Sequence, residues 1–290
     1  MIPPVFDYHC PKTLEEAVAL LTRYGDSAKV MSGGQSLLPM LKIRLASTEH
    51  VIDISRIERL AYLREANGRL EIGACTPESA LEESELIRSR YPILYDTTRV
   101  IADPLVRNRA TVGGNLAHGD PANDHPATMI ALRAEVVAIG PRGERVIPAV
   151  QLFRGLFSTA LQPDEILTEI RVPTPKGKSG GAYVKLERKV GDFATAAAAA
   201  QVTLAAGGAV ERVGLALTNL GPVPIQAAAA EQYLTGKAPS DQAIAEAARL
   251  AADAAQPSAD RRGGVDYKRE MARVHAGRAL KLAIQRAGGQ

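Results

Sequence analysis

The pattern of apolar and polar positions defines the first elements of the chain. Apolar residues at helical spacing, preceded by the capping-box pair Thr13 and Glu16, predict a helix over residues 14–24. Gly25 ends this helix. Residues 28–31 predict a short strand, which delivers the chain directly to a diglycine.

The middle of the chain alternates short apolar runs with stretches of helical periodicity. Strands are predicted at residues 50–54, 69–73, 135–139, 145–147 and 165–172, and helices at residues 77–84, 86–101 and 124–133. A second diglycine, at positions 113–114, is predicted to lie in a long loop between two of these helices. A loop of that length inside a domain is usually functional.

A segment rich in proline and glycine, residues 173–181, is the best candidate for a linker. Beyond it the pattern predicts strands at residues 182–188, 194–206 and 210–217, followed by helices at residues 227–234, 243–255 and 267–285. The middle strand contains the alanine run 196–200, whose high helix propensity competes with a strand. A smaller α+β domain is therefore predicted for the C-terminal part.

Composition excludes several classes of protein. The 290 residues carry a net charge of only +3, with basic and acidic residues interspersed, which argues against a nucleic-acid-binding protein. The chain contains no apolar run of membrane-spanning length and no signal peptide at its start, so a cytoplasmic location is the default expectation. Its two cysteines, Cys10 and Cys75, are too few for an iron–sulfur cluster and are expected to be small buried residues.

Familiar catalytic and metal-binding patterns are missing from the sequence. The five histidines never occur at a metal-ligand spacing, so no metal site is predicted. Residues 177–179 resemble only the end of a phosphate-binding P-loop, and the dinucleotide fingerprint with three spaced glycines does not occur. A nucleophile elbow is also missing, and no catalytic residue is predicted.

The two polar-flanked diglycines, at positions 33–34 and 113–114, are the main candidate for a binding site. Glycine accepts φ > 0 and lets a ligand approach the backbone, so each pair could form a concave nest of N–H donors for an anion. Two nests that converge could hold both phosphates of a dinucleotide cofactor. The alternative is that each diglycine is only a tight turn.

The context of the second diglycine is similar to a known family signature. Residues 108–124 read Asn-Arg-Ala-Thr-Val-Gly-Gly-Asn-Leu-Ala-His-Gly-Asp-Pro-Ala-Asn-Asp and resemble the FAD-binding medium subunit of molybdenum hydroxylases, the carbon monoxide dehydrogenase and xanthine dehydrogenase family. Residues 32–39 resemble the other FAD signature of that family, and the similarity continues through residues 153–161 and 185–194.

The resemblance implies an α+β fold in two domains. Residues 1–177 would form a two-part FAD-binding domain of the vanillyl-alcohol oxidase and p-cresol methylhydroxylase type, with subdomains of about 1–55 and 56–177. Residues 178–290 would form the C-terminal domain, with a three-stranded antiparallel sheet and helices.

The resemblance also implies the residues that bind FAD. The diphosphate would lie between residues 31–38 and 111–115, with other residues near the ring and ribityl parts, and Lys185 could stabilise negative charge on reduced flavin. The implied residues are Met31, Ser32, Gly33, Gly34, Gln35, Ser36, Leu37, Leu38, Ile101, Ala110, Thr111, Gly113, Gly114, Asn115, Ala117, Asp124, Leu161, Lys185 and Phe193. The chain departs from the family pattern at Ala110, where glycine is usual, and at His125, where an apolar residue is frequent. The roles of His118 and His125 stay open.

The implied function is electron transfer. A large molybdopterin-binding subunit and a small iron–sulfur subunit would be the partners, assembled as a dimer of heterotrimers, and electrons would pass through FAD on this chain to an external acceptor. A free-standing FAD-dependent oxidoreductase of the same fold is the first alternative, and a non-redox nucleotide-binding or scaffold protein is the second. Carbon monoxide, aldehydes, purines and N-heterocycles stay open as substrates of the complex, and quinone, oxygen or a nicotinamide as the acceptor.

Overall fold

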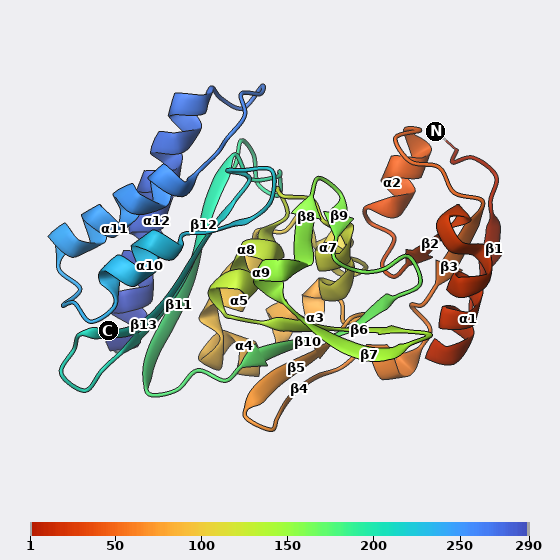
Figure 1. Ribbon diagram of the computed structural model, residues 1–290, viewed down its shortest axis with the longest axis horizontal. Helices are drawn as coiled ribbons and strands as arrows, with labels where there is room; N and C mark the ends of the chain where they lie inside the picture. Colours follow the sequence, from red (N-terminus) through yellow and green to blue (C-terminus); the bar gives the residue numbers. More distant parts are fainter. Residues whose placement is uncertain (1, 289–290) are drawn as a thin grey trace.

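The computed structural model describes residues 2–288, so the outermost ends of the two predicted domains, residues 1 and 289–290, lie outside it. A three-stranded parallel sheet of order β1-β3-β2 stands at one end of the molecule, and a five-stranded antiparallel sheet of order β4-β5-β10-β6-β7 lies in the middle (Figure 1). A four-stranded antiparallel sheet of order β11-β12-β13-β14 lies at the other end.

The strands are β1 (Asp7–His9), β2 (Ala28–Met31), β3 (His50–Asp53), β4 (Leu63–Ala66), β5 (Arg69–Gly73), β6 (Glu135–Gly140), β7 (Gly143–Pro148), β8 (Phe153–Gly155), β9 (Ser158–Thr159), β10 (Ile166–Pro173), β11 (Lys178–Leu186), β12 (Ala196–Leu204), β13 (Val210–Thr218) and β14 (Ile225–Gln226). The α-helices are α1 (Leu14–Tyr24), α2 (Leu37–Lys42), α3 (Glu78–Glu83), α4 (Glu85–Arg90), α5 (Pro92–Arg99), α6 (Pro104–Arg107), α7 (Val112–His118), α8 (Asp124–Ala131), α9 (Ala149–Leu152), α10 (Ala228–Leu234), α11 (Asp241–Ala254) and α12 (Val265–Gly288). Short 3-10 turns cover Gly25–Ser27 and Glu58–Leu60.

Three buried clusters hold these layers together. Helices α5 and α8 pack between the five-stranded sheet and the C-terminal sheet, and their apolar side chains form the largest cluster with residues of both sheets. Helices α10, α11 and α12 cover the opposite face of the C-terminal sheet (Figure 1). The third cluster lies between α1, the parallel sheet and the edge of the central sheet.

The predicted α+β organisation is confirmed, and several boundaries agree closely. Helix α1 spans the predicted residues 14–24, and both halves of the capping box around Thr13 and Glu16 are formed. The predicted antiparallel C-terminal sheet is present, with the two-residue strand β14 added as a fourth strand. None of the helices formed by residues 2–288 combines the length and the apolar content of a membrane span.

Three predictions of local structure were wrong. The single helix predicted at 86–101 is split into α4 and α5, because Pro92 lacks an amide hydrogen and starts a new helix. The second diglycine lies in the first turn of α7 and not in a loop, with Thr111 as the N-cap. The predicted linker is shorter than 173–181, since β10 extends to Pro173 and β11 already begins at Lys178.

The alanine run 196–200 forms the middle of β12 because helices cover both faces of that strand. All five alanines are fully buried. Their small side chains allow the helices to approach closely, and neighbouring glycines do the same. A Cβ atom on Gly180 would lie 2.3 Å from the carbonyl oxygen of Ala283 in α12, and one on Gly214 would lie 2.0 Å from that of Ala131 in α8. Tertiary packing therefore overrides the helix propensity of alanine here.

Candidate functional site

A cavity of about 430 Å³ lies where the loop after β2 meets the first turn of α7. The parallel sheet provides one wall and α7 provides the other. Fourteen of the residues implied for cofactor binding line this cavity, which brings together two segments that are far apart in the sequence. They are Met31, Ser32, Gly33, Gly34, Gln35, Ser36, Leu37, Ala110, Thr111, Gly113, Gly114, Asn115, Ala117 and Leu161.

The loop that contains the first diglycine has unused backbone donors. Strand β2 ends at Met31 and α2 begins at Leu37, so residues 32–36 form a tight loop between them. Gly34 has a φ of +74°, a backbone conformation that would be strained for a residue with a side chain. Within residues 2–288, the consecutive peptide N–H groups of residues 33–36 donate to no protein acceptor. These donors are therefore available to a ligand.

The second diglycine differs from this expectation. The N–H of Gly113 donates to the carbonyl oxygen of Ala74 at 3.0 Å, and the N–H of Gly114 donates to Thr111 Oγ1 at 3.2 Å. These donors serve the protein and do not form a free nest. This segment forms part of the cavity wall and places the side chain of Asn115 there. The buried Oδ1 atom of Asn115 has no hydrogen-bond partner within the described chain.

The two segments touch each other at the bottom of the cavity. A Cβ atom on Gly33 would lie 1.9 Å from the carbonyl oxygen of Arg109, so only glycine permits this approach. The hydroxyl of Thr111 donates to Ser32 Oγ at 3.0 Å, across 79 positions of sequence. The convergence expected from the sequence is therefore present in the structure.

Five of the implied residues lie outside this cavity: Leu38, Ile101, Asp124, Lys185 and Phe193. Leu38 belongs to α2, Ile101 is buried, and Phe193 is about half exposed. Asp124 and Lys185 form a separate buried cluster.

Lys185 Nζ contacts Asp124 Oδ2 at 3.0 Å, Glu187 Oε2 at 3.4 Å and the carbonyl oxygen of Val100 at 2.9 Å. Tyr183 also donates to Asp124 Oδ1 at 2.6 Å. Burial raises the pKa of the Asp124 carboxyl, and the ammonium of Lys185 opposes that shift. Lys185 therefore lies within 3.4 Å of two carboxyl groups in this cluster.

The two histidines left open by the sequence have different surroundings. His118, at the end of α7, lines the cavity, and its ring centroid lies 4.9 Å from that of Phe157. Burial lowers the pKa of His118, which favours the neutral ring. His125 lies away from the cavity and is fully buried, with Nε2 2.7 Å from Glu78 Oε2. At His125, where an apolar residue is frequent in the family, the structure therefore places a carboxyl group opposite the ring.

Sequence reasoning missed several residues of this site. Lys29, Val30, Met40, Ala46, Ile54, Ala74, Phe157, Glu165, Ile166 and Leu167 also line the cavity. Glu165 is neutralised by two hydrogen bonds from Arg145, at 2.6 and 2.7 Å, which lower the pKa of Glu165. Phe157 lies in the segment 153–161, whose similarity to the family was the only signal available for it.

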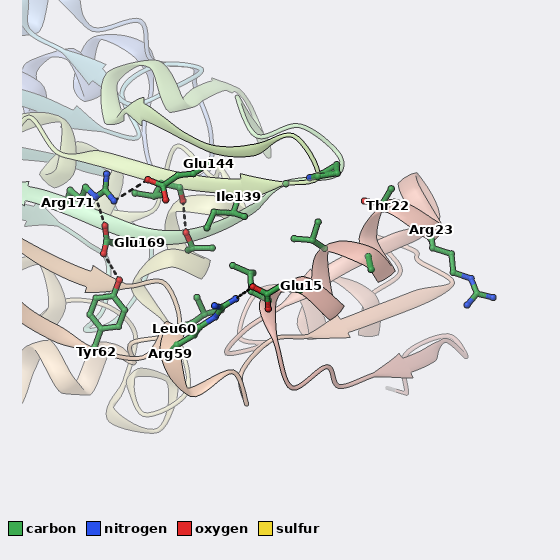
Figure 2. A pocket seen from close by; sticks show the side chains of 17 residues that line it. Glu15, Thr22, Arg23, Arg59, Leu60, Tyr62, Ile139, Glu144, Glu169 and Arg171 are labelled. Carbon is green, nitrogen blue, oxygen red and sulfur yellow. Dashed lines mark hydrogen bonds and ion pairs between the residues drawn. The ribbon is translucent and has the colours of Figure 1, made fainter.

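A second and larger cavity, of about 810 Å³, lies between α1 and the outer face of the central sheet. Figure 2 shows several of its polar side chains bound to one another: Tyr62 donates to Glu169 at 2.5 Å, Glu169 also pairs with Arg171, and Arg59 pairs with Glu15 at 2.6 Å. None of the implied cofactor-binding residues lines it. It is therefore separate from the cavity lined by the two diglycine segments.

Comparisons with known proteins identify the family. Residues 4–175 match the FAD binding domain in molybdopterin dehydrogenase, and residues 181–283 match the CO dehydrogenase flavoprotein C-terminal domain. The chain belongs to this flavoprotein family. Its cofactor is FAD, and it is an oxidoreductase subunit. The predicted order, an FAD-binding domain followed by a C-terminal α+β domain, is confirmed.

Several relatives match this chain over nearly its whole length. The carbon monoxide dehydrogenase medium chain of Hydrogenophaga pseudoflava is 46% identical and that of Afipia carboxidovorans 43% identical, each over 99% of both chains. The solved carbon monoxide dehydrogenase of Hydrogenophaga pseudoflava superposes with a TM-score of 0.96 at 48% identity, over 99% of both chains. Quinoline 2-oxidoreductase of Pseudomonas putida 86 superposes with a TM-score of 0.92 at 30% identity, again over 99% of both chains.

The cavity fits a part of FAD on its own chemistry. The free N–H groups of residues 33–36 suit phosphate oxygens, and the unpaired Oδ1 of Asn115 suits a hydroxyl or amine donor. Lys29, also on the wall, adds a positive charge. The apolar residues Met31, Ala117 and Leu161 complete the lining.

Proposed function

We propose that this chain is the electron-transfer subunit of a molybdenum-containing hydroxylase or dehydrogenase complex. It takes electrons from iron–sulfur clusters of a small partner subunit and passes them to an external acceptor. A large molybdopterin-binding subunit supplies the electrons, and the assembly is a dimer of heterotrimers. The relatives named above are medium chains of multi-subunit enzymes, which supports this arrangement.

FAD, when bound, supplies both one-electron exchange with clusters and two-electron exchange with an acceptor. The chain itself binds and orients the cofactor. The observation that carries the proposal is the meeting of two remote segments at one cavity, where Gly33 lies against the backbone at Arg109 and the N–H groups of residues 33–36 are unused. We propose that the diphosphate binds to these N–H groups, with residues 110–115 closing the opposite side.

We propose that the buried cluster around Asp124 and Lys185, together with Ile101, Leu161 and Phe193, borders the ring and ribityl parts of the cofactor. In this role the cluster is structural, because Lys185 is already paired with two carboxylates. Its contribution is to hold β11 and α8 at a fixed distance. Tyr183, on the same strand, reinforces this link through Asp124.

The test is isolation of the tagged full-length chain from its native host. We expect it to carry visible flavin absorbance and to co-elute with a molybdenum-containing large subunit and an iron–sulfur small subunit. Addition of a reducing substrate of the complex should bleach the flavin. A protein that elutes alone and rapidly oxidises an alcohol or another small reductant would instead support the free-standing oxidoreductase.

A further inference from the structure

A directed chain of hydrogen bonds runs beneath the cavity from one binding segment to the other. Gly114 N–H donates to Thr111 Oγ1 at 3.2 Å, and the Thr111 hydroxyl donates to Ser32 Oγ at 3.0 Å. Ser32 donates to Cys75 Sγ at 3.2 Å, and the thiol of Cys75 donates to the carbonyl oxygen of Ile54 at 3.6 Å. Ser32, Thr111, Gly114 and Ile54 line the cavity, whereas Cys75 lies behind them.

Cys75 lies at the centre of the segment that holds both walls of the cavity. The carbonyl oxygens of its two neighbours accept hydrogen bonds from α7: Ala74 from Gly113 at 3.0 Å, and Thr76 from Val112 at 3.1 Å. The side chain of Cys75 reaches the other wall through Ser32. Residues 74–76 therefore connect the loop at residues 32–36 to the first turn of α7.

The direction of these hydrogen bonds determines whether each hydroxyl can still donate to a ligand. A hydroxyl or thiol has one hydrogen to donate. The hydrogens of Thr111 and Ser32 are both used inside the protein, so in this arrangement neither hydroxyl donates to a phosphate. Burial raises the pKa of the Cys75 thiol to about 11, which keeps it protonated and able to donate to Ile54 at neutral pH.

We propose that Cys75 is a positioning residue for the dinucleotide: its thiol holds Ser32, and through Ser32 it keeps the free N–H groups of the first loop aimed into the cavity. This inference rests on the proposed FAD site. The thiol acts as a hydrogen-bonding group, and not only as the small buried residue that the sequence suggested. It touches no cofactor atom itself.

The experiment compares Cys75→Ser, Cys75→Val and Cys75→Ala in the full-length chain, isolated with any subunits that co-purify. The protein is stripped of flavin and titrated with FAD, followed by the quenching of flavin fluorescence. Serine keeps one donor and one acceptor, whereas valine keeps the buried apolar volume and loses both. Cys10→Ser and Cys10→Val are the matched controls at the chain's other cysteine, which is partly exposed.

A positioning role predicts that Cys75→Ser binds FAD nearly as well as the unmodified chain. It also predicts that Cys75→Val and Cys75→Ala bind about tenfold more weakly, the loss expected for one buried hydrogen bond. Both Cys10 variants should be unchanged. Far-UV circular dichroism and thermal unfolding of each apoprotein identify any variant that has lost its fold.

A packing role predicts the reverse order, with valine better than serine, and that result would overturn the inference. Equal binding by all three folded Cys75 variants would overturn it as well. Failure of the unmodified chain to bind FAD in any purified form would refute the proposed function instead, so the two failures are distinguishable.

Discussion

The buried pair of Glu78 and His125 offers the sharpest test of how the α3 and α8 helices are held. Both side chains are fully buried, and Nε2 of His125 lies 2.7 Å from Oε2 of Glu78. The remaining polar atoms, Glu78 Oε1 and His125 Nδ1, have no partner within residues 2–288. Each group therefore depends on the other for its only compensating contact inside the described chain.

Replacing one member alone should be costly. His125→Leu leaves the buried Glu78 side chain without its hydrogen-bond partner, which costs about 1–3 kcal/mol of unfolding free energy. Glu78→Gln keeps a hydrogen-bonding side chain of the same shape and should cost about 1 kcal/mol. The double variant Glu78→Leu with His125→Leu removes both polar groups, so it should be more stable than His125→Leu alone.

Urea unfolding of the full-length chain, followed by far-UV circular dichroism, measures this order of stability. The exposed pair of Glu246 and Arg249, joined at 2.6 Å on the surface of α11, is the control, and Glu246→Ala should leave the urea midpoint unchanged. The reasoning fails if His125→Leu unfolds at the same urea concentration as the unmodified chain. It also fails if the double variant is less stable than both single variants.

Three further outcomes are expected. Gly33→Ala places a Cβ atom 1.9 Å from the carbonyl oxygen of Arg109, so it should force the two segments apart and abolish FAD retention, measured as flavin per chain after gel filtration. Burial lowers the pKa of His118, so at mildly acidic pH the unfolded chain takes up a proton that the folded chain does not, and the urea midpoint should fall as the pH drops below the ordinary histidine pKa of about 6.5. His118→Gln should make that fall shallower. An unchanged pH profile in this variant would contradict a lowered pKa of His118 in the folded chain. Lys185→Met leaves the buried Asp124 without its cation and raises the pKa of that carboxyl further. The variant should lose about 3 kcal/mol of unfolding free energy at neutral pH, measured by urea unfolding, and progressively less as acid protonates Asp124. A loss that does not depend on pH would point to packing alone.

Elements with local signals could be predicted from the sequence almost to the residue. Helix α1 begins and ends where its capping box and Gly25 place it, because the groups that cap it lie within four residues of its ends. The break at Pro92 also had a local signal, since proline at the first position of a helix is common. By contrast, β12 depends on helices that cover both of its faces, and the helix propensity of its alanines gives no information about them.

The same distinction separates the two diglycines. In the first diglycine the N–H groups donate to no acceptor within residues 2–288. The sequence correctly predicted that this diglycine lies at the end of a strand. The second contributes no free diglycine donors, because Gly113 binds Ala74, a residue far upstream that no local pattern connects to it. Identical dipeptides therefore make different hydrogen bonds, and only the tertiary structure shows which one leaves its N–H groups unpaired within residues 2–288.

Departures from a family pattern are informative when the structure shows what lies opposite them. His125 departs from the frequent apolar residue, and Glu78, 47 positions away, provides its partner. Since an unpaired buried polar group at either position would be costly, the two residues are expected to change together among relatives. Ala110 departs from the usual glycine, yet its carbonyl oxygen accepts a hydrogen bond from the backbone N–H of Glu78 at 2.9 Å. Both departures therefore meet at α3, whose first residue supports the second segment of the cofactor site through its backbone and α8 through its side chain.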